Sequence, residues 1–151
     1  MNYEELISQC NMYIKEIKET INSPEKVAEI IRPLITDIKQ EMLFVCHLSS
    51  KNDIIKIENV SKGMLNQTLI SSREIFRTAI IEGSAGIIIA HNHPSGNPKP
   101  STQDIKCTKR LLEASKIIDI PIVDHLIIVE KNNKYNDFIS MKEECQYILD
   151  F

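Results

Sequence analysis

Residues 86–90, Gly-Ile-Ile-Ile-Ala, restrict the fold more than any other segment, because none of their side chains is polar. A strand that is apolar at every position is typical of a sheet buried on both faces. Further segments favour extended chain, at 42–48, 54–60, 121–130 and near the C-terminus. Helical patterns lie before and between them, at 24–35, 72–82 and 101–118. This alternation of helices and strands predicts the α/β class.

The N-terminal segment carries a separate amphipathic pattern over residues 3–19, with apolar side chains three and four positions apart. Ser23 and Pro24 then predict the start of a second helix, as its N-cap and its first residue. Pro33 is expected to kink or end that helix. We therefore divide the chain into a helical extension, 1–23, and one domain, 24–151. The extension could pack on the domain, mediate a homodimer or dock a partner.

Composition excludes several classes of protein. The 151 residues have a net charge of −3, so a strongly basic nucleic-acid-binding protein is not indicated. The four cysteines form no Cys-x-x-Cys pair, which predicts reduced thiols and a cytoplasmic location. The acidic N-terminus does not resemble a signal peptide. The longest run of apolar residues and glycine, 85–90, is far shorter than the roughly 20 residues of a membrane span.

Two histidines follow the apolar strand, at positions 91 and 93, and Asp104 comes eleven residues after the second. Side chains two positions apart on extended chain point the same way, so His91 and His93 could face one point. Ligand sites of open α/β sheets lie at the carboxyl ends of strands. Two imidazoles and one carboxylate are a ligand set of catalytic zinc sites, in which water takes the fourth position.

Simpler interpretations exist for the same residues. A His-x-His beside a Pro-Ser-Gly turn could be turn chemistry, and Ser101 with Asp104 resembles a capping box. The two roles of Asp104 are compatible, since a residue in the first turn of a helix could also reach the histidines. On a helical wheel Asp104 borders the apolar side of the helix, where an acid needs a partner. The basic residues lie on the other side, which we interpret as solvated: Lys106, Lys109, Arg110 and Lys116.

The spacing His-x-His, seven residues, Ser, two residues, Asp matches the JAMM/MPN+ metalloprotease pattern. The longer stretch AHNHPSGNPKPSTQD resembles the RadC family of JAMM-like (JAB domain) proteins, formerly named as DNA repair proteins. SPEKVAEIIRPL, LNQTLISSREIFRTAI, RLLEASKIIDIPIVDHLII and FISMKE resemble the same family, in the same order. The resemblance covers about residues 24–145.

The resemblance implies a cytidine-deaminase-like fold, with a mixed, curved sheet packed between helices. It implies that His91, His93 and Asp104 bind zinc and that a water completes the site. It also implies that Glu41 is the general base and that Ser101 hydrogen-bonds the oxyanion. The implied reaction is hydrolysis of a peptide or isopeptide bond.

The chain also differs from the family. Only about 23 residues precede SPEKV, too few for the N-terminal helix-hairpin-helix module of longer relatives, which weakens a role on DNA. Ser71-Ser72 replaces a His-Pro pair, and Val129-Glu130 replaces a glycine and is expected to extend a strand. His125 could orient a metal ligand or be a structural residue of the core. We interpret His47 as structural.

Three functions remain open from the sequence. The first is a zinc metallohydrolase acting on an unidentified protein or peptide. The second is a repair-associated protein that contacts DNA or a repair complex through Lys106, Lys109 and Arg110. The third is a non-catalytic interaction domain. A zinc deaminase is excluded because the chain has no Pro-Cys-x-x-Cys. The tripeptide His-Asn-His does not indicate an HNH nuclease, because the HNH motif takes its three residues from separate segments.

Overall fold

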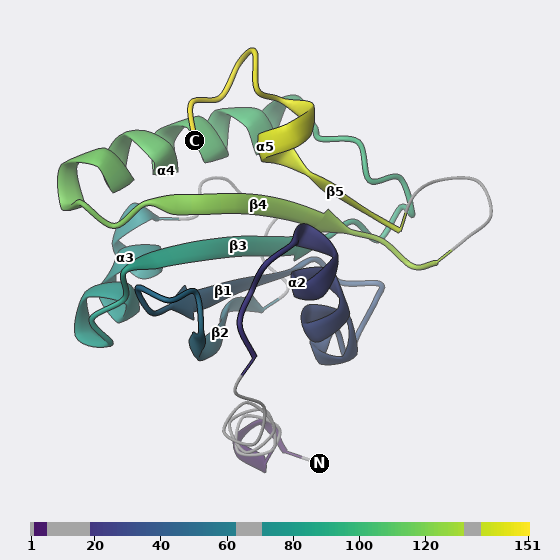
Figure 1. Cartoon of the computed structure of the whole chain (residues 1–151). Helices are drawn as coiled ribbons and strands as arrows, with labels where there is room; N and C mark the ends of the chain where they lie inside the picture. The colour runs from purple at the N-terminus through teal and green to yellow at the C-terminus, as the bar shows by residue number, and fades with distance from the viewer. Residues whose placement is uncertain (1, 6–18, 63–70, 132–136) are drawn as a thin grey trace.

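The computed structural model describes residues 2–5, 19–62, 71–131 and 137–151. Its sheet has five strands in the order β2-β1-β3-β4-β5 (Figure 1). The strand bounds are Met42–Leu48 (β1), Ile54–Lys62 (β2), Gly86–Asn92 (β3), Ile122–Ile128 (β4) and Phe138–Ser140 (β5). Only β3 and β4 run parallel, and the other neighbouring pairs are antiparallel. The predicted α/β class and mixed sheet are confirmed.

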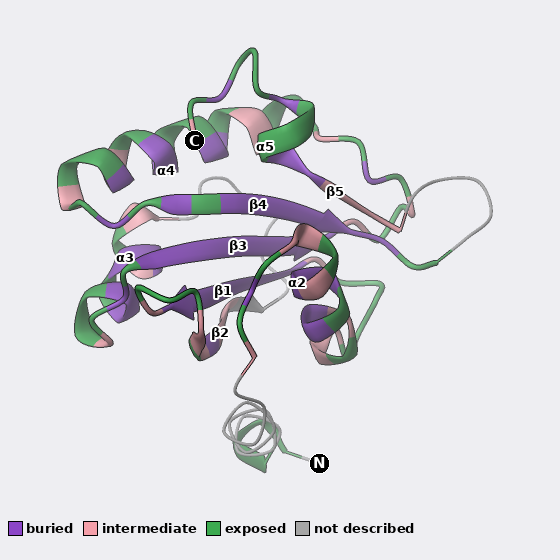
Figure 2. Ribbon diagram, viewed as in Figure 1, coloured by how far each residue is buried: buried purple, intermediate pink, exposed green. Residues whose placement is uncertain are grey.

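Helices cover both faces of this sheet. They are Pro24–Ile31 (α2), Ser72–Ile81 (α3), Thr102–Ile118 (α4) and Met141–Glu144 (α5). On one face, α3, α4 and α5 pack against alternate residues of the strands, including Val45, Ile89 and Ile127. On the other face, α2 packs against the intervening residues, such as Phe44 and Ile88. Figure 2 shows β1 and β3 buried along their length, as the apolar run at 86–90 requires.

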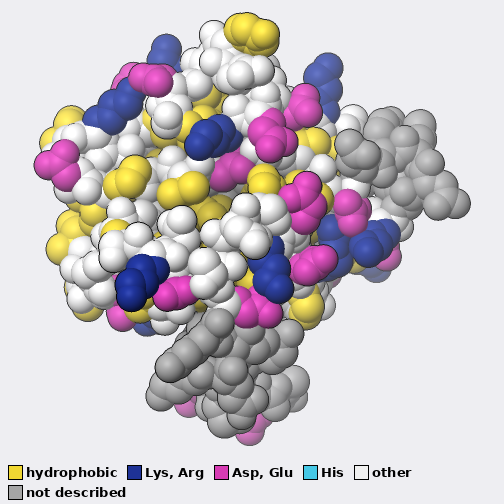
Figure 3. All heavy atoms as spheres, viewed as in Figure 1, with side chains coloured by type: hydrophobic (Ala, Val, Ile, Leu, Met, Phe, Trp, Pro, Cys, Tyr) yellow, Lys and Arg dark blue, Asp and Glu magenta, His cyan; other side chains and the backbone are white. Residues whose placement is uncertain are grey.

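Ser23 caps α2 and Pro24 is its first residue, as predicted. The α-helix ends at Ile31 and a short 3-10 helix, Arg32–Leu34, continues it through Pro33. Between α2 and α5 the sheet face is hollowed, and the hollow is lined by Leu48, Ile88 and Leu126. Figure 3 views this face and shows hydrophobic side chains gathered across its middle.

One expectation from the sequence is wrong, and one helix of the structure was not expected. The prediction that Val129-Glu130 extends a strand is wrong, because β4 ends at Ile128. The carbonyl oxygen of Val129 accepts a hydrogen bond from Nη1 of Arg32 at 2.6 Å, so it is taken by a side chain. The short helix α5 was not expected from the sequence. Most of the predicted 3–19 helix lies outside the described residues, although residues 3–5 are helical.

The C-terminal elements are fastened to the sheet by Asp124, which is buried in β4. Its Oδ2 accepts a hydrogen bond from the hydroxyl of Ser140 at 2.6 Å, and its Oδ1 accepts one from the backbone N–H of Lys142 at 3.2 Å. Oδ1 also accepts the backbone N–H of His125 at 2.7 Å. Burial raises the pKa of the Asp124 carboxyl above its ordinary value.

Replacing Asp124 with alanine is expected to lower the free energy of unfolding by about 3 kcal/mol, because several buried donors lose their acceptor. Urea denaturation would measure the loss. Lys142→Ala is the matched control, since Lys142 contributes only its backbone N–H to this contact. Equal stability of Asp124→Ala and the control would contradict the anchoring role.

Within the described residues, no helix has the length and apolar character needed to cross a bilayer.

Candidate metal centre

Four side chains that could bind a metal ion meet at the carboxyl end of β3. They are Glu41, His91, His93 and Asp104, and their ligand atoms all lie within 4.8 Å of one another. His91 is buried and the other three are partly exposed. The residues come from three places in the chain, since Glu41 precedes β1, the histidines end β3 and Asp104 lies in the first turn of α4.

The end of β3 places the two histidines. His91 lies in the strand, and His93 follows it with its backbone N–H bonded to the carbonyl of Ile128 in β4. The two Nε2 atoms are 3.1 Å apart, so the side chains do face one point, as their spacing predicts. Nδ1 of His93 is 2.9 Å from the carbonyl oxygen of Asn97, to which it donates, and this leaves the Nε2 lone pair for the cluster.

The loop after His93 turns back at Gly96. Its φ of +80° lies in the left-handed region that favours glycine. The N–H of Gly96 donates to the carbonyl of His93 at 3.1 Å and closes the turn. The turn brings the carbonyl of Asn97 within hydrogen-bond distance of Nδ1 of His93. The turn at Gly96 therefore helps to set the orientation of the His93 ring.

His91 is supported from behind by His125. Nδ1 of His91 lies 2.7 Å from Nε2 of His125, and Nδ1 of His125 lies 2.7 Å from Oγ1 of Thr108. Burial first, and then the neighbouring His91, lower the pKa of His125 well below its ordinary value, so this ring is neutral. A neutral His125 accepts from Nδ1–H of His91 and donates to Thr108, which leaves Nε2 of His91 as a lone pair. For His125 the sequence left two roles open, one that orients a metal ligand and one that is structural. These contacts favour the orienting role.

Asp104 reaches both histidines from the start of α4. Its Oδ2 is 3.1 Å from Nε2 of His93, and its Oδ1 is 3.3 Å from Nε2 of His91. The capping box is present as well, because Oγ of Ser101 accepts from the N–H of Asp104 and Oδ2 accepts from the N–H of Ser101. Burial acts to raise the pKa of Asp104. In the metal-free protein, where the imidazoles can carry a proton on Nε2, hydrogen bonds from the histidines outweigh burial and hold the pKa far below its ordinary range.

The spacing of these ligand atoms fits a metal ion. A tetrahedral ion with bonds of about 2.0 Å holds its ligand atoms about 3.3 Å apart. The separations among His91, His93 and Asp104 are 3.1, 3.1 and 3.3 Å. Two nitrogen lone pairs and a carboxylate repel one another at such distances unless a proton or a metal cation lies between them. A single divalent cation could therefore bind the ligand atoms of all three side chains together.

The family model described as RadC-like JAB domain matches residues 21–146. The chain belongs to the RadC family. It is 39% identical over 140 residues to a UPF0758 protein of Methanosarcina mazei, a match that covers 93% of this chain and 59% of that protein. A UPF0758 protein of Clostridium perfringens is 39% identical over 93% of this chain and 62% of its own length. A UPF0758 protein of Clostridium beijerinckii is 46% identical, over 82% of this chain and 52% of the relative. The chain thus spans between half and two thirds of these relatives.

The other residues predicted for this RadC-like site also lie at it. Oε1 of Glu41 is 3.7 Å from Nε2 of His91, farther than the Asp104 oxygens, so this carboxylate lies beside the three candidate ligands. Ser101 is exposed and lies at the N-cap of α4. Its Oγ accepts the N–H of Asp104 and keeps its own hydrogen available to donate. His47 lies at the opposite end of β1, is fully buried and contacts Oγ of Ser84, in keeping with a structural role.

Two further residues of the RadC-like site escaped the sequence analysis. Thr108 carries no motif, and its hydroxyl reaches His125 because α4 packs over β4. Asn92 lies between the two candidate histidine ligands, where the pattern His-x-His leaves its identity open. Helical spacing did place Thr108 one turn after Asp104, which was the available signal.

Replacing His125 with alanine is expected to weaken metal affinity by about 10- to 100-fold, because the partner that fixes a ligand's ring orientation is lost. Thr108→Val, which keeps the shape of the side chain and removes the hydroxyl, is expected to act in the same direction with a smaller effect. Competition with a chromogenic chelator measures both. Unchanged affinity in His125→Ala would leave this histidine a purely structural role.

Proposed function

We propose that this domain is a zinc-dependent hydrolase that cleaves a peptide or isopeptide bond. One observation supports the proposal above all. Two histidines and one aspartate have the spacing of tetrahedral ligands, and Oε1 of Glu41 lies 3.7 Å from Nε2 of one of them, His91. Two nitrogens and one oxygen suit zinc, and three protein ligands leave a position open to solvent, as in catalytic sites. When bound, zinc would polarise the scissile carbonyl and lower the pKa of water toward about 7.

The chain's own groups supply proton transfer and stabilisation. The carboxylate of Glu41 would accept a proton from the attacking water and pass it to the leaving amine. The hydroxyl of Ser101 would donate to the oxygen that gains charge as the carbonyl is attacked. His91, His93 and Asp104 would hold the cation, and His125 would keep His91 in the tautomer that offers Nε2.

The test combines metal analysis with a substrate panel. Purified protein is expected to contain about one zinc per chain by mass spectrometry of the metal. The zinc-loaded protein is then assayed against fluorogenic peptides, ubiquitin-like conjugates with isopeptide bonds, and single- and double-stranded DNA. Cleavage of a peptide or isopeptide bond that stops on addition of a chelator supports the proposal. A protein that retains no zinc would end it.

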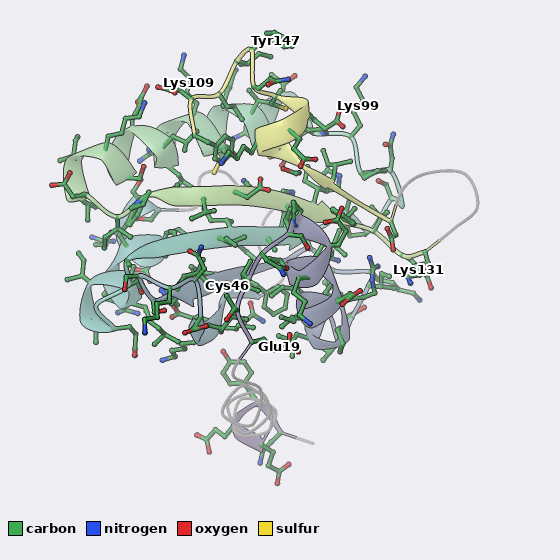
Figure 4. The ribbon with its side chains drawn as sticks, in the orientation of Figure 1. Glu19, Cys46, Lys99, Lys109, Lys131 and Tyr147 are labelled. Atoms are coloured by element: carbon green, nitrogen blue, oxygen red, sulfur yellow. The ribbon has the colours of Figure 1, made fainter. Side chains whose placement is uncertain are left out.

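A DNA-associated role is the competing proposal. It is favoured by one feature, the basic side chains on the outer face of α4, Lys106, Lys109 and Arg110, which are all exposed. Lys109 points from α4 into solvent in Figure 4. The fourth basic residue predicted there, Lys116, is paired with Asp150 at 2.7 Å. Salt-dependent DNA binding that is lost in a Lys109→Glu, Arg110→Glu variant would favour this role, and its absence would favour the hydrolase.

A further inference from the structure

Asn92 is the residue between the two histidine ligands, and its side chain points the other way. Adjacent residues of a strand project to opposite faces, so His91 and His93 face the metal cluster and Asn92 faces the start of β1. The side chain is buried, with 1% of the residue exposed. Its Oδ1 accepts the backbone N–H of Met42 at 2.6 Å, and its Nδ2 donates to the carbonyl of Gln40 at 2.9 Å.

These two hydrogen bonds enclose Glu41. The carbonyl of Gln40 belongs to the peptide group before Glu41, and the N–H of Met42 belongs to the peptide group after it. Fixing both peptide planes fixes φ and ψ of the residue between them, since these are the only soft backbone torsions there. A single primary amide can do this because it carries a donor and an acceptor side by side.

The clamp acts where the sheet itself stops. The backbone register of β1 and β3 ends with the pair Leu43 and His91, and the register of β1 and β2 ends at Met42, so neither ladder includes Glu41. The residues before β1 are exposed over 36–40, and Glu41 is only partly buried. Without another anchor the carboxylate would start from a fraying strand end. The amide of Asn92 replaces the missing ladder bonds with side-chain bonds.

We propose that Asn92 is a positioning residue that holds Glu41 beside the metal ligands, an inference that rests on the proposed hydrolase function. The tripeptide 91–93 then has a task at every position. His91 and His93 bind the cation, and Asn92 places the base from the opposite side of the same strand. A general base displaced by about 1 Å can lose about 100-fold in rate, so such an anchor has a measurable consequence.

The proposal is tested with Asn92→Ala and with Asn92→Asp, which keeps the shape and the acceptor for Met42 but not the amide donor. Asn92→Ala is expected to lower kcat by about 10- to 100-fold with KM and zinc affinity unchanged. Asn92→Asp should fall between wild type and Asn92→Ala. Ser115→Ala is the matched control, since it removes another buried hydrogen bond, from its Oγ to the carbonyl of Leu112, away from the site. Its kcat should equal that of wild type.

The double variant with Glu41→Gln separates positioning from general packing. If Asn92 acts through Glu41, Asn92→Ala causes no further loss of kcat once Glu41 is Gln. An equal loss in both backgrounds, or a loss of zinc affinity in Asn92→Ala, would overturn the proposal.

A structural readout keeps the proposal testable if no substrate is found. Crystal structures of the zinc-loaded wild type and Asn92→Ala would be compared at Glu41, together with hydrogen exchange of the Met42 amide. A displaced Glu41 carboxylate and faster Met42 exchange in Asn92→Ala support the clamp. An unmoved carboxylate overturns it, whatever the activity of the wild type. An inactive wild type with a displaced carboxylate in the variant would refute the hydrolase function alone.

Discussion

Replacing His93 with alanine is expected to lower zinc affinity by more than about 100-fold, because losing a direct ligand costs more than losing the partner behind one. In wild type, zinc at about 100 times its Kd should stabilise the fold by about 2.7 kcal/mol. For a domain of this size that corresponds to a rise in Tm of about 5 to 10 °C. Differential scanning fluorimetry with and without zinc should show this rise in wild type and none in His93→Ala.

The same experiment distinguishes loss of a ligand from loss of the fold. Nε2 of His93 lies 3.1 Å from Nε2 of His91, and this proximity is unfavourable unless a charge lies between them. In a chelator, His93→Ala should still unfold in one cooperative transition, since His93 is only partly buried and is not a residue of either hydrophobic cluster. Asp150→Asn, which alters an exposed ion pair away from the site, should keep the full zinc response. A zinc response retained in His93→Ala would contradict the ligand set.

The elements of the fold that could be predicted from sequence are those with a local physical cause. Ser23 and Pro24 set the start of α2 through capping and fixed φ, both of which act within a few residues. The apolar run at 86–90 had to be buried on both faces, and β3 is. The residue after β4 is contacted instead by Arg32, whose Nη1 reaches the Val129 carbonyl from 97 positions away in sequence. No local pattern contains such a contact.

The site follows the same division. His91, His93 and Asp104 could be connected from sequence because strand alternation and the first turn of a helix are local geometry. Glu41 was expected only through the family resemblance, since an acidic residue before a strand has no distinctive local signal. Asn92 and Thr108 were missed because their partners, Met42 and His125, lie 50 and 17 positions away. These partners can be identified only from the three-dimensional structure, in which the strands and α4 are packed together.

Replacing Glu41 with glutamine is expected to lower kcat and kcat/KM together by about 100- to 10,000-fold, the contribution of a positioned general base. Glutamine keeps the size of the side chain but cannot accept the proton of the attacking water. Zinc should remain bound, since the Glu41 carboxylate lies 3.7 Å from His91 while the Asp104 carboxylate lies closer, at 3.3 Å. Steady-state kinetics on the substrate found in the panel, with zinc content measured on the same sample, would test both statements.

The control for this variant is Glu113→Gln, which removes the same charge from an exposed position on α4. It should keep wild-type kcat, so that a fall in Glu41→Gln reports position and not net charge. If Glu41→Gln retained activity, the proton would have to pass through another group, and Glu41 would not be the base. If it lost zinc instead, Glu41 would be a fourth ligand, and no protein carboxylate would be left beside the cation to take a proton, because the cluster contains only Glu41 and Asp104 among the described residues. Retained zinc with lost turnover is therefore the outcome that ties the carboxylate before β1 to catalysis.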